Sequence, residues 1–345
     1  MKLSEVSTEN QLWGFMTTPS SGLVQALAEI GDGDMMVLGG SGKMGKELIG
    51  LVKQCDVQNQ VNRNISVAST FSNARDYTDL ENLGTTCYRG DLSQEQFLDS
   101  LPNAPLVVYM MGFKFGSGDD WRKSFQMNSV VPYLVGSKYQ ESSIVVFSSG
   151  NPYPHTAKLG TGANEDTALD PVGIYGWTIV ARESSFKTTA MQFPDQKISI
   201  YRLMYAQHLQ YGVLIDLARM IRDGQPISLQ MPAVNLISQR DANEVALKSF
   251  LKCNKAGWTV NAAGPVCQVR DITQQLADHI GKVVQFADEA GELALLADDS
   301  LARSTFGEYR DSVDDMIEAA ANWVKRGGDY WGKPTMFGRT CLLYT

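Results

Sequence analysis

Apolar and polar residues alternate along this chain in blocks rather than singly. Five short apolar runs lack the period-two alternation of a half-exposed strand: 35–40, 65–70, 104–112, 143–150 and 197–204. Amphipathic segments with a helical period separate several of these runs: 43–54, 121–139 and 174–192. A strand that is apolar throughout is buried on both faces, as in a parallel sheet covered by helices on either side. The pattern therefore predicts an α/β fold with a Rossmann-type, doubly wound parallel sheet.

The pattern divides the chain into four parts. Residues 1–33 predict an N-terminal helical extension, and 34–204 a dinucleotide-binding Rossmann domain. Residues 205–325 form a mixed region with a smaller C-terminal substrate lobe and returning elements, and the Gly/Pro-rich segment 326–345 predicts an irregular tail. Within the mixed region, three segments resemble small elements inserted around the sheet: 212–229, 233–237 and 258–264.

Composition narrows the possible partners and compartments. The 345 residues are 43% hydrophobic and 20% charged, and the net charge of −8 argues against nucleic acid or an anionic membrane as a partner. The five cysteines have neither an even count nor the spacing of a zinc site, which favours reduced thiols. No apolar run has the length of a membrane span or the context of an export signal. We expect a cytoplasmic protein.

A glycine-rich turn follows the first predicted strand. In "VLGGSGKMGKEL", Gly39, Gly42 and Gly45 recur at every third position between a strand and a helix. Such glycines permit a tight turn, close approach of the backbone to a pyrophosphate and close helix packing, and the helix N-terminus faces the negative charge. The context predicts dinucleotide binding, with Lys43 and Met44 beside the phosphates.

The end of the second predicted strand bears on the choice of cofactor. An acidic residue there would bind the adenosine ribose of NAD, but "VASTFSNAR" offers Ser69 and Thr70, with Arg75 downstream. Because nothing acidic repels a 2′-phosphate at these positions, we expect NAD or NADP, with a slight preference for NADP.

Several motifs together resemble a known family. The glycine turn, "GDL" at 90–92, "MMGFKFG" after the fourth strand, Asn128, "VFSSGNPYP" at 146–154 and "YGWTI" at 175–179 are similar to the NAD-dependent epimerase/dehydratase family of extended short-chain dehydrogenase/reductases. The resemblance covers about residues 34 to 325. It implies hydride transfer on a sugar, sugar acid or related polyol, and a homodimer formed through helices 121–139 and 174–192.

The resemblance also implies roles for individual residues. The three glycines would hold the pyrophosphate, Asp91 and Leu92 the adenine, and Met111 with Gly112 would line the cofactor after the fourth strand. Ser149 would be the active-site hydroxyl and Tyr175 the acid/base. Taken alone, Tyr175 fits a packed aromatic ring better, and Ser149 fits a hydroxyl that caps backbone better; their pairing at the family spacing favours the catalytic roles.

One position departs from the family pattern. The family has a lysine four residues after the tyrosine, whose ammonium lowers the pKa of the phenol. This chain has Ile179 there. Lys114, on the loop after the fourth strand, is either a replacement charge or a solvated surface lysine. The alternative to an enzyme is a non-catalytic dinucleotide-binding sensor or partner protein.

The substrate side is the least defined. Tyr205 and His208 follow the sixth predicted strand, where members of this family contact the substrate, and Asn235 and Arg240 lie in the lobe that would close over it. Aromatic and imidazole groups suit a sugar, and an arginine suits an acidic or phosphorylated group. His208 by itself is also consistent with a structural histidine. No metal site is expected.

Overall fold

A seven-stranded sheet forms the centre of the protein. The computed structural model describes residues 1–114, 120–333 and 335. Every pair of neighbouring strands in the sheet is parallel. The strands lie in the order β11 (Trp258–Ala262), β7 (Lys197–Leu203), β5 (Ser143–Ser149), β4 (Leu106–Tyr109), β1 (Met35–Leu38), β2 (Ile65–Ser69) and β3 (Thr86–Arg89). The predicted doubly wound fold is confirmed.

The strand order reverses between β1 and β4. The chain moves from β1 outward to β2 and β3, then returns past β1 to β4, β5, β7 and β11. Met35 and Leu38 of β1 pair with Leu106 and Tyr109 of β4, so both strands end at the same level. In open α/β sheets this reversal point leaves a crevice at the carboxyl ends of the strands, where ligands bind.

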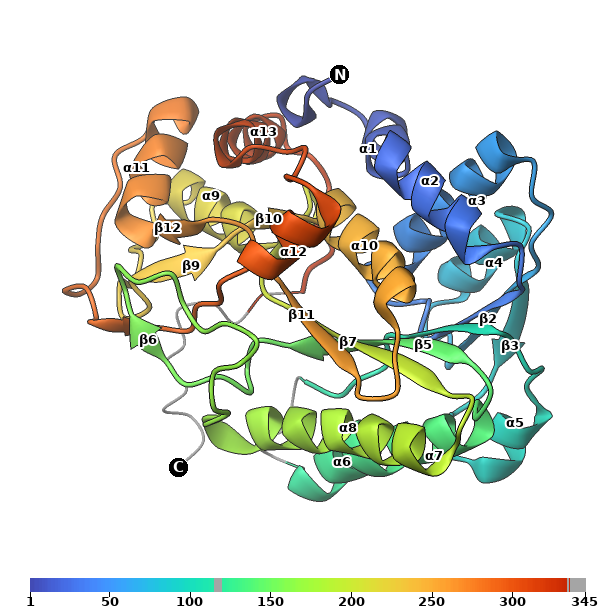
Figure 1. Cartoon of the computed structure of the whole chain (residues 1–345). Helices are drawn as coiled ribbons and strands as arrows, with labels where there is room; N and C mark the ends of the chain where they lie inside the picture. The colour runs from blue at the N-terminus through green and yellow to red at the C-terminus, as the bar shows by residue number, and fades with distance from the viewer. Residues whose placement is uncertain (115–119, 334, 336–345) are drawn as a thin grey trace.

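Helices cover both faces of the sheet (Figure 1). The helices beside one face are α5 (Glu95–Ser100), α6 (Trp121–Phe125), α7 (Val131–Lys138) and α8 (Gly173–Gln192). Those beside the other face are α2 (Ser21–Ile30), α3 (Gly45–Asn59), α4 (Ala74–Asn82) and α10 (Gln239–Lys248). Alternate residues of β1 enter the two cores: Met36 packs with the α7–α8 side and Val37 with the α3 side. This double burial explains the continuous apolar runs.

The helix expected over 121–139 contains a wide turn. Between α6 and α7 the backbone forms a π-helical turn, Gln126–Val130, and Pro132 lies at the start of α7. Such turns occur frequently at functional sites. The side chain of Asn128, within this turn, is fully buried.

A second group of elements forms the C-terminal lobe. Its helices are α9 (Val213–Arg222), α11 (Val269–Ile280) and α13 (Val313–Lys325), whereas α12 (Ser300–Phe306) packs beside β11 at the edge of the central sheet. Short strand pairs accompany them: β9 (Ala233–Asn235) with β12 (Val266–Gln268), β8 (Ala206–Gln207) with β10 (Ile237–Ser238), and β6 (Thr156–Ala157) with β13 (Leu293–Ala294). Segment 258–264, expected among the inserted elements, instead contributes β11 to the edge of the central sheet, where Val260 is fully buried.

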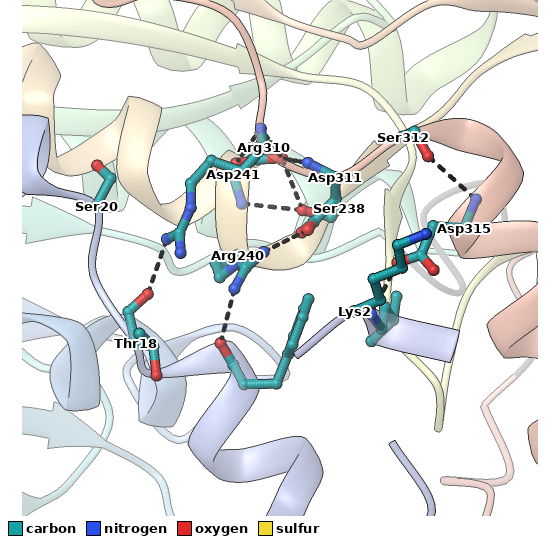
Figure 2. Close-up of polar contacts among 12 residues, drawn as sticks. Lys2, Thr18, Ser20, Ser238, Arg240, Asp241, Arg310, Asp311, Ser312 and Asp315 are labelled. Carbon is teal, nitrogen blue, oxygen red and sulfur yellow. Dashed lines mark hydrogen bonds and ion pairs between the residues drawn. The ribbon is translucent and has the colours of Figure 1, made fainter. Parts of the chain in front are cut away.

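The N-terminal extension packs on both parts of the molecule. It consists of a 3-10 turn (Leu3–Glu5), α1 (Glu9–Met16) and α2. Apolar side chains of α1 join the core of the C-terminal lobe, whereas those of α2 join the core around α3. Polar contacts help to fix it: Arg310 donates to the Thr18 carbonyl at 2.9 Å (Figure 2), and Asp315 accepts from the Leu3 amide at 2.8 Å.

Two further features concern the described residues as a whole. Cys55, Cys87, Cys253 and Cys267 are free thiols, and Cys341 lies outside the part that the structure describes. Within that part, no helix combines the length and the apolar character needed to cross a membrane.

Candidate active site

The glycine turn joins β1 to α3 at the reversal point of the sheet. Gly39 has φ of +85°, and a β-carbon there would lie 2.9 Å from the Met111 amide nitrogen. A β-carbon on Gly45 would overlap the carbonyl oxygen of Gly40. Gly42 is exposed, and its nearest contact would be the Gly39 carbonyl oxygen at 3.3 Å. Two of the glycines thus permit packing within the protein, and Gly42 leaves an open backbone surface before the N-terminus of α3.

A cavity of about 660 Å³ adjoins this turn. Its walls include Gly42 and Lys43 of the turn, Arg75 and Asp76 of α4, and Trp331 of the C-terminal segment. The volume lies within the range of small-molecule sites. Ser149 and Tyr175 are not among the described residues that line it, so the cavity covers only the glycine-turn side of the crevice.

Acidic residues that the sequence analysis did not consider also line this cavity. Asp76 and Asp79 lie 3.1 and 3.0 Å from the Lys46 ammonium, which offsets their charge. Because Asp76 and Asp79 follow Arg75 in the same helix, the sequence could have predicted that they also lie near the glycine turn. Arg75 itself has a side chain that is 79% exposed and lies 3.9 Å from Asp79.

Lys43 has an unusual environment for a lysine. Its pKa is lowered to about 7, mainly by burial and also by the nearby charges of Lys333 and Lys114, while Asp216 acts in the opposite sense. Its ammonium lies 3.3 Å from the centre of the Tyr211 ring. A phosphate beside Lys43 would favour the ammonium form.

The predicted adenosine-binding residues occupy the ends of β2 and β3. The Ser69 hydroxyl lies 2.5 Å from that of Ser41 in the glycine turn, and Thr70 is exposed. Asp91 is exposed and accepts from the Ser93 amide, whereas Leu92 is buried. Met44 is the half-buried residue that precedes α3, and Met111 and Gly112 follow β4.

Ser149 and Tyr175 come together from different elements. Ser149 is the last residue of β5 and Tyr175 lies in the first turn of α8. The Tyr175 phenol lies beside the Ser149 hydroxyl, which itself donates to Asn151 Oδ1 at 3.1 Å. Burial raises the pKa of the half-buried Tyr175, while the charge of Arg182 and the Ser149 hydroxyl lower it. The Lys114 ammonium lies 5.6 Å from the centre of the tyrosine ring. The two hydroxyls therefore lie together at the carboxyl edge of the sheet.

Arg182 and Asn128 were not among the predicted site residues. Arg182 lies seven residues after Tyr175 in α8, on the buried face of the helix. Its Nη2 donates to Asn128 Oδ1 at 2.6 Å and its Nη1 to the Phe147 carbonyl at 2.8 Å. Ile179, in the lysine position of the family, is fully buried. The sequence held one signal for Arg182. Residues seven apart share a helix face, so Arg182 was expected on the same face of its helix as Tyr175.

The four predicted substrate residues have partners within the protein. His208 is buried, with Nε2 2.9 Å from Glu47 Oε1 and Nδ1 accepting from the Gln210 amide. Asn235 is fully buried and donates to the carbonyls of residues 264 and 297. Arg240 pairs with Asp311 in the cluster beside the N-terminal extension (Figure 2). Tyr205 is half-buried against the core of the C-terminal lobe.

The C-terminal segment packs beside His208 at the glycine turn. The Trp331 ring stacks on His208 with centroids 4.7 Å apart and lies near Tyr211 at 6.1 Å. The Tyr330 hydroxyl donates to Asp216 at 3.1 Å, and the Thr335 amide donates to the same carboxylate at 2.9 Å. The described part of the predicted tail therefore packs on the body of the protein and forms one wall of the cavity.

No protein-family model matches the sequence, and a comparison with curated proteins finds no match either. Solved structures do match the fold. MoeE5 in complex with UDP-glucose and NAD superposes with a TM-score of 0.68 and 17% identity, over 86% of this chain and 99% of that one. The UDP-glucuronic acid 4-epimerase of Bacillus cereus in complex with NAD gives 0.68 and 18%, over 85% and 99%.

The UDP-glucose 4-epimerase of Thermotoga maritima, solved with UDP-glucose, gives a TM-score of 0.69 and 15% identity, over 85% of this chain and 99% of that one. At such identities the likeness establishes the fold alone. The expected fold is confirmed: the chain has a Rossmann-type, doubly wound architecture similar to that of these solved structures.

Proposed function

We propose that this protein is an enzyme that uses a nicotinamide dinucleotide to transfer hydride to and from a sugar nucleotide. The observation that carries the proposal is the placement of the Ser149 and Tyr175 hydroxyls beside each other at the carboxyl end of β5, one strand from the reversal point of the sheet. The ligands of the similar structures, UDP-glucose, UDP-glucuronic acid and NAD, support this class of substrate and cofactor.

The residues around the turn fit a dinucleotide. Gly42 leaves open backbone before the N-terminus of α3, and Lys43 can supply a positive charge to a phosphate. When bound, the nicotinamide ring would accept and return the hydride. Tyr175 would take the proton of the substrate hydroxyl as a carbonyl forms, and return it in the reverse step. Ser149 would hold the same oxygen by a hydrogen bond.

The choice between the two dinucleotides rests on the end of β2. Ser69 and Thr70 carry no charge, and the exposed Arg75 could reach a 2′-phosphate. The carboxylates of Asp76 and Asp79 would disfavour a 2′-phosphate, although the Lys46 ammonium offsets their negative charge. NAD in the similar structures favours NAD, whereas the residues at the strand end favour NADP. We propose that the site binds NADP at least as tightly as NAD.

The first prediction separates the turn's binding role from its structural role. Gly42→Val should keep the fold, because a side chain there meets little of the protein, yet it should lower affinity for NAD and NADP at least about 100-fold by blocking the phosphates. Gly45→Val should lower the melting temperature as well, since it overlaps the Gly40 carbonyl. Gly14→Val, on the exposed side of α1, is the control. Calorimetric titration of a folded Gly42→Val protein with unchanged affinity would refute the assignment.

The second prediction concerns pH and Lys43. At pH 8 most Lys43 side chains in the free protein are neutral, because their pKa is about 7, and a bound pyrophosphate would restore the charge. Binding should therefore take up close to one proton at pH 8 and little at pH 6, and affinity should fall as pH rises above 7. Calorimetry in buffers with different ionisation enthalpies measures this uptake. Lys43→Met should abolish it; the same uptake in that variant would exclude Lys43 as its source.

The third prediction tests the chemistry. Tyr175→Phe should lower turnover of UDP-glucose or UDP-glucuronic acid by about 10²- to 10⁴-fold, the usual contribution of an acid/base group. Ser149→Ala should also lower kcat. Tyr133→Phe, on the surface of α7, is the matched control and should have no effect. The products are measured by NMR, and dinucleotide reduction by absorbance.

The alternative function is a non-catalytic dinucleotide-binding protein. The buried Ile179 favours it, because no ammonium occupies the position that the family uses. Under this alternative the wild-type protein binds NAD or NADP but does not convert any of these sugar nucleotides. Full activity of Tyr175→Phe would also exclude the proposed mechanism, whereas binding without turnover in the wild type would favour the sensor or partner role.

We further propose that the protein forms a homodimer through the outer surfaces of α6, α7 and α8, which lie together along one face (Figure 1). Large apolar side chains are exposed there: Trp121 (51%), Phe125 (38%), Val130 (53%), Tyr133 (39%) and Trp177 (54%). Contiguous exposed apolar residues mark interaction surfaces more often than isolated ones do.

The corresponding prediction uses sedimentation at micromolar concentration. The wild type should sediment as a dimer, and the double variant Phe125→Glu/Trp177→Glu as a monomer, because it places charges in the interface. Val283→Glu, at an exposed apolar residue beyond α11, should remain dimeric. A monomeric wild type would contradict the proposal.

A further inference from the structure

Four arginines are buried among the described residues, and one of them differs from the rest. Arg63 pairs with Asp56, Arg202 with Glu183, and Arg240 with Asp311. Arg182 is only 4% exposed, yet within residues 1–114, 120–333 and 335 it has no carboxylate partner. A buried charge without a counter-ion is costly, so its retention calls for an explanation.

The partners of Arg182 are neutral oxygens. Its two Nη atoms donate to Asn128 Oδ1 and the Phe147 carbonyl, and its guanidinium lies 5.6 Å from the centre of the Tyr109 ring. In the described part of the chain, Nε has no hydrogen-bond partner. The adjacent Glu183 cannot neutralise Arg182, because it binds Arg202 through both carboxylate oxygens, at 2.9 and 2.6 Å.

The guanidinium lies under the backbone that leads into the active site. A β-carbon on Gly112 would be 2.5 Å from Arg182 Nη2, so the chain after β4 passes directly over the charge. Asn128, which binds Arg182, also accepts from the Phe113 amide at 2.9 Å and donates to the Phe113 carbonyl at 2.8 Å. Arg182 and Asn128 thus fix the loop that carries Lys114.

The same charge is close to Tyr175. Arginine side chains in a helix extend toward its N-terminus, so Arg182 extends toward the first turn of α8, where Tyr175 lies. Arg182 binds the carbonyl of Phe147, and the phenol lies beside Ser149, two residues further along β5. Positions two apart on a strand are about 7 Å from each other, so both groups lie at the same end of β5, and the charge of Arg182 lowers the pKa of the phenol. A unit charge about 7 Å from a phenol, in an effective dielectric of about 20, shifts its pKa by about one to two units.

We propose that Arg182 is a positioning cation for the Ser149–Tyr175 pair: its unneutralised guanidinium stabilises the phenolate form of Tyr175 and holds the loop at Gly112 and Phe113 in place. This inference rests on the proposed role of Tyr175 in proton transfer. Arg182 would supply the positive charge that Ile179 cannot provide. The charge in this arrangement comes from the helix position seven residues after the tyrosine, rather than four.

The phenol itself provides the test, without substrate or dinucleotide. Site-specific 3,5-difluorotyrosine at position 175 has a more acidic phenol than tyrosine and a ¹⁹F signal distinct from the protein's other tyrosines, so its pKa can be measured by NMR. Arg182→Met should raise that pKa by about one to two units. Arg182→Lys should restore most of the wild-type value. Lys114→Met should leave it within about half a unit.

A second variant protects the test against misfolding of Arg182→Met. Asn128→Asp places a carboxylate beside the guanidinium without altering either Arg182 or Tyr175, and should also raise the phenol pKa. An unchanged pKa in folded Arg182→Met, or a shift in Lys114→Met as large as the one predicted for Arg182→Met, would overturn the inference. Turnover assays answer the separate question of function: an inactive wild type with the predicted ¹⁹F shifts would refute the proposed reaction and retain the electrostatic coupling.

Discussion

The close approach of two backbone segments at the reversal point of the sheet determines where the site lies. The end of β1 packs against the chain leaving β4, and a β-carbon on Gly39 would lie 2.9 Å from the Met111 nitrogen. Because residue 39 is a glycine with positive φ, the turn can bend there and bring the N-terminus of α3 to the crevice. A bulkier residue would separate the glycine turn from the loop at Gly112.

Helix α8 links this crevice to the core. Tyr175 lies beside Ser149 at the strand ends, Arg182 donates to Asn128, which holds the chain after β4, and Glu183 pairs with Arg202 near the end of β7. Glu183 also accepts from Ser148, the neighbour of Ser149. The helix therefore carries Tyr175 and holds the end of β5 next to Ser149 through buried polar contacts. We infer that these contacts, and not the missing lysine alone, determine the behaviour of the phenol.

The sequence was sufficient to predict the architecture because the fold depends on local patterns. Apolar runs and a glycine turn at a strand–helix junction specify a doubly wound sheet, and the protein has that sheet. Segment 258–264 was harder to assign, because its place at the sheet edge depends on pairing with β7, which is distant in sequence.

Other features could not be read from local patterns. The partners of His208, Asn235 and Arg240 come from segments far apart in the chain, such as Glu47, residue 297 and Asp311. The packing of Trp331 on His208 is likewise a long-range contact. Arg182 could have been found from the sequence, since it shares a helix face with Tyr175, but only the three-dimensional structure shows that no carboxylate of the described residues pairs with it.

The central claim is that the crevice holds a nicotinamide dinucleotide with its reactive end against the Ser149–Tyr175 pair. A crystal structure of the protein grown with NADH or NADPH tests this most directly. We expect the pyrophosphate at the Gly39–Gly45 turn and the nicotinamide between Gly112 and Tyr175. A structure in which saturating dinucleotide leaves the turn empty, or places the nicotinamide away from Tyr175, would contradict the account.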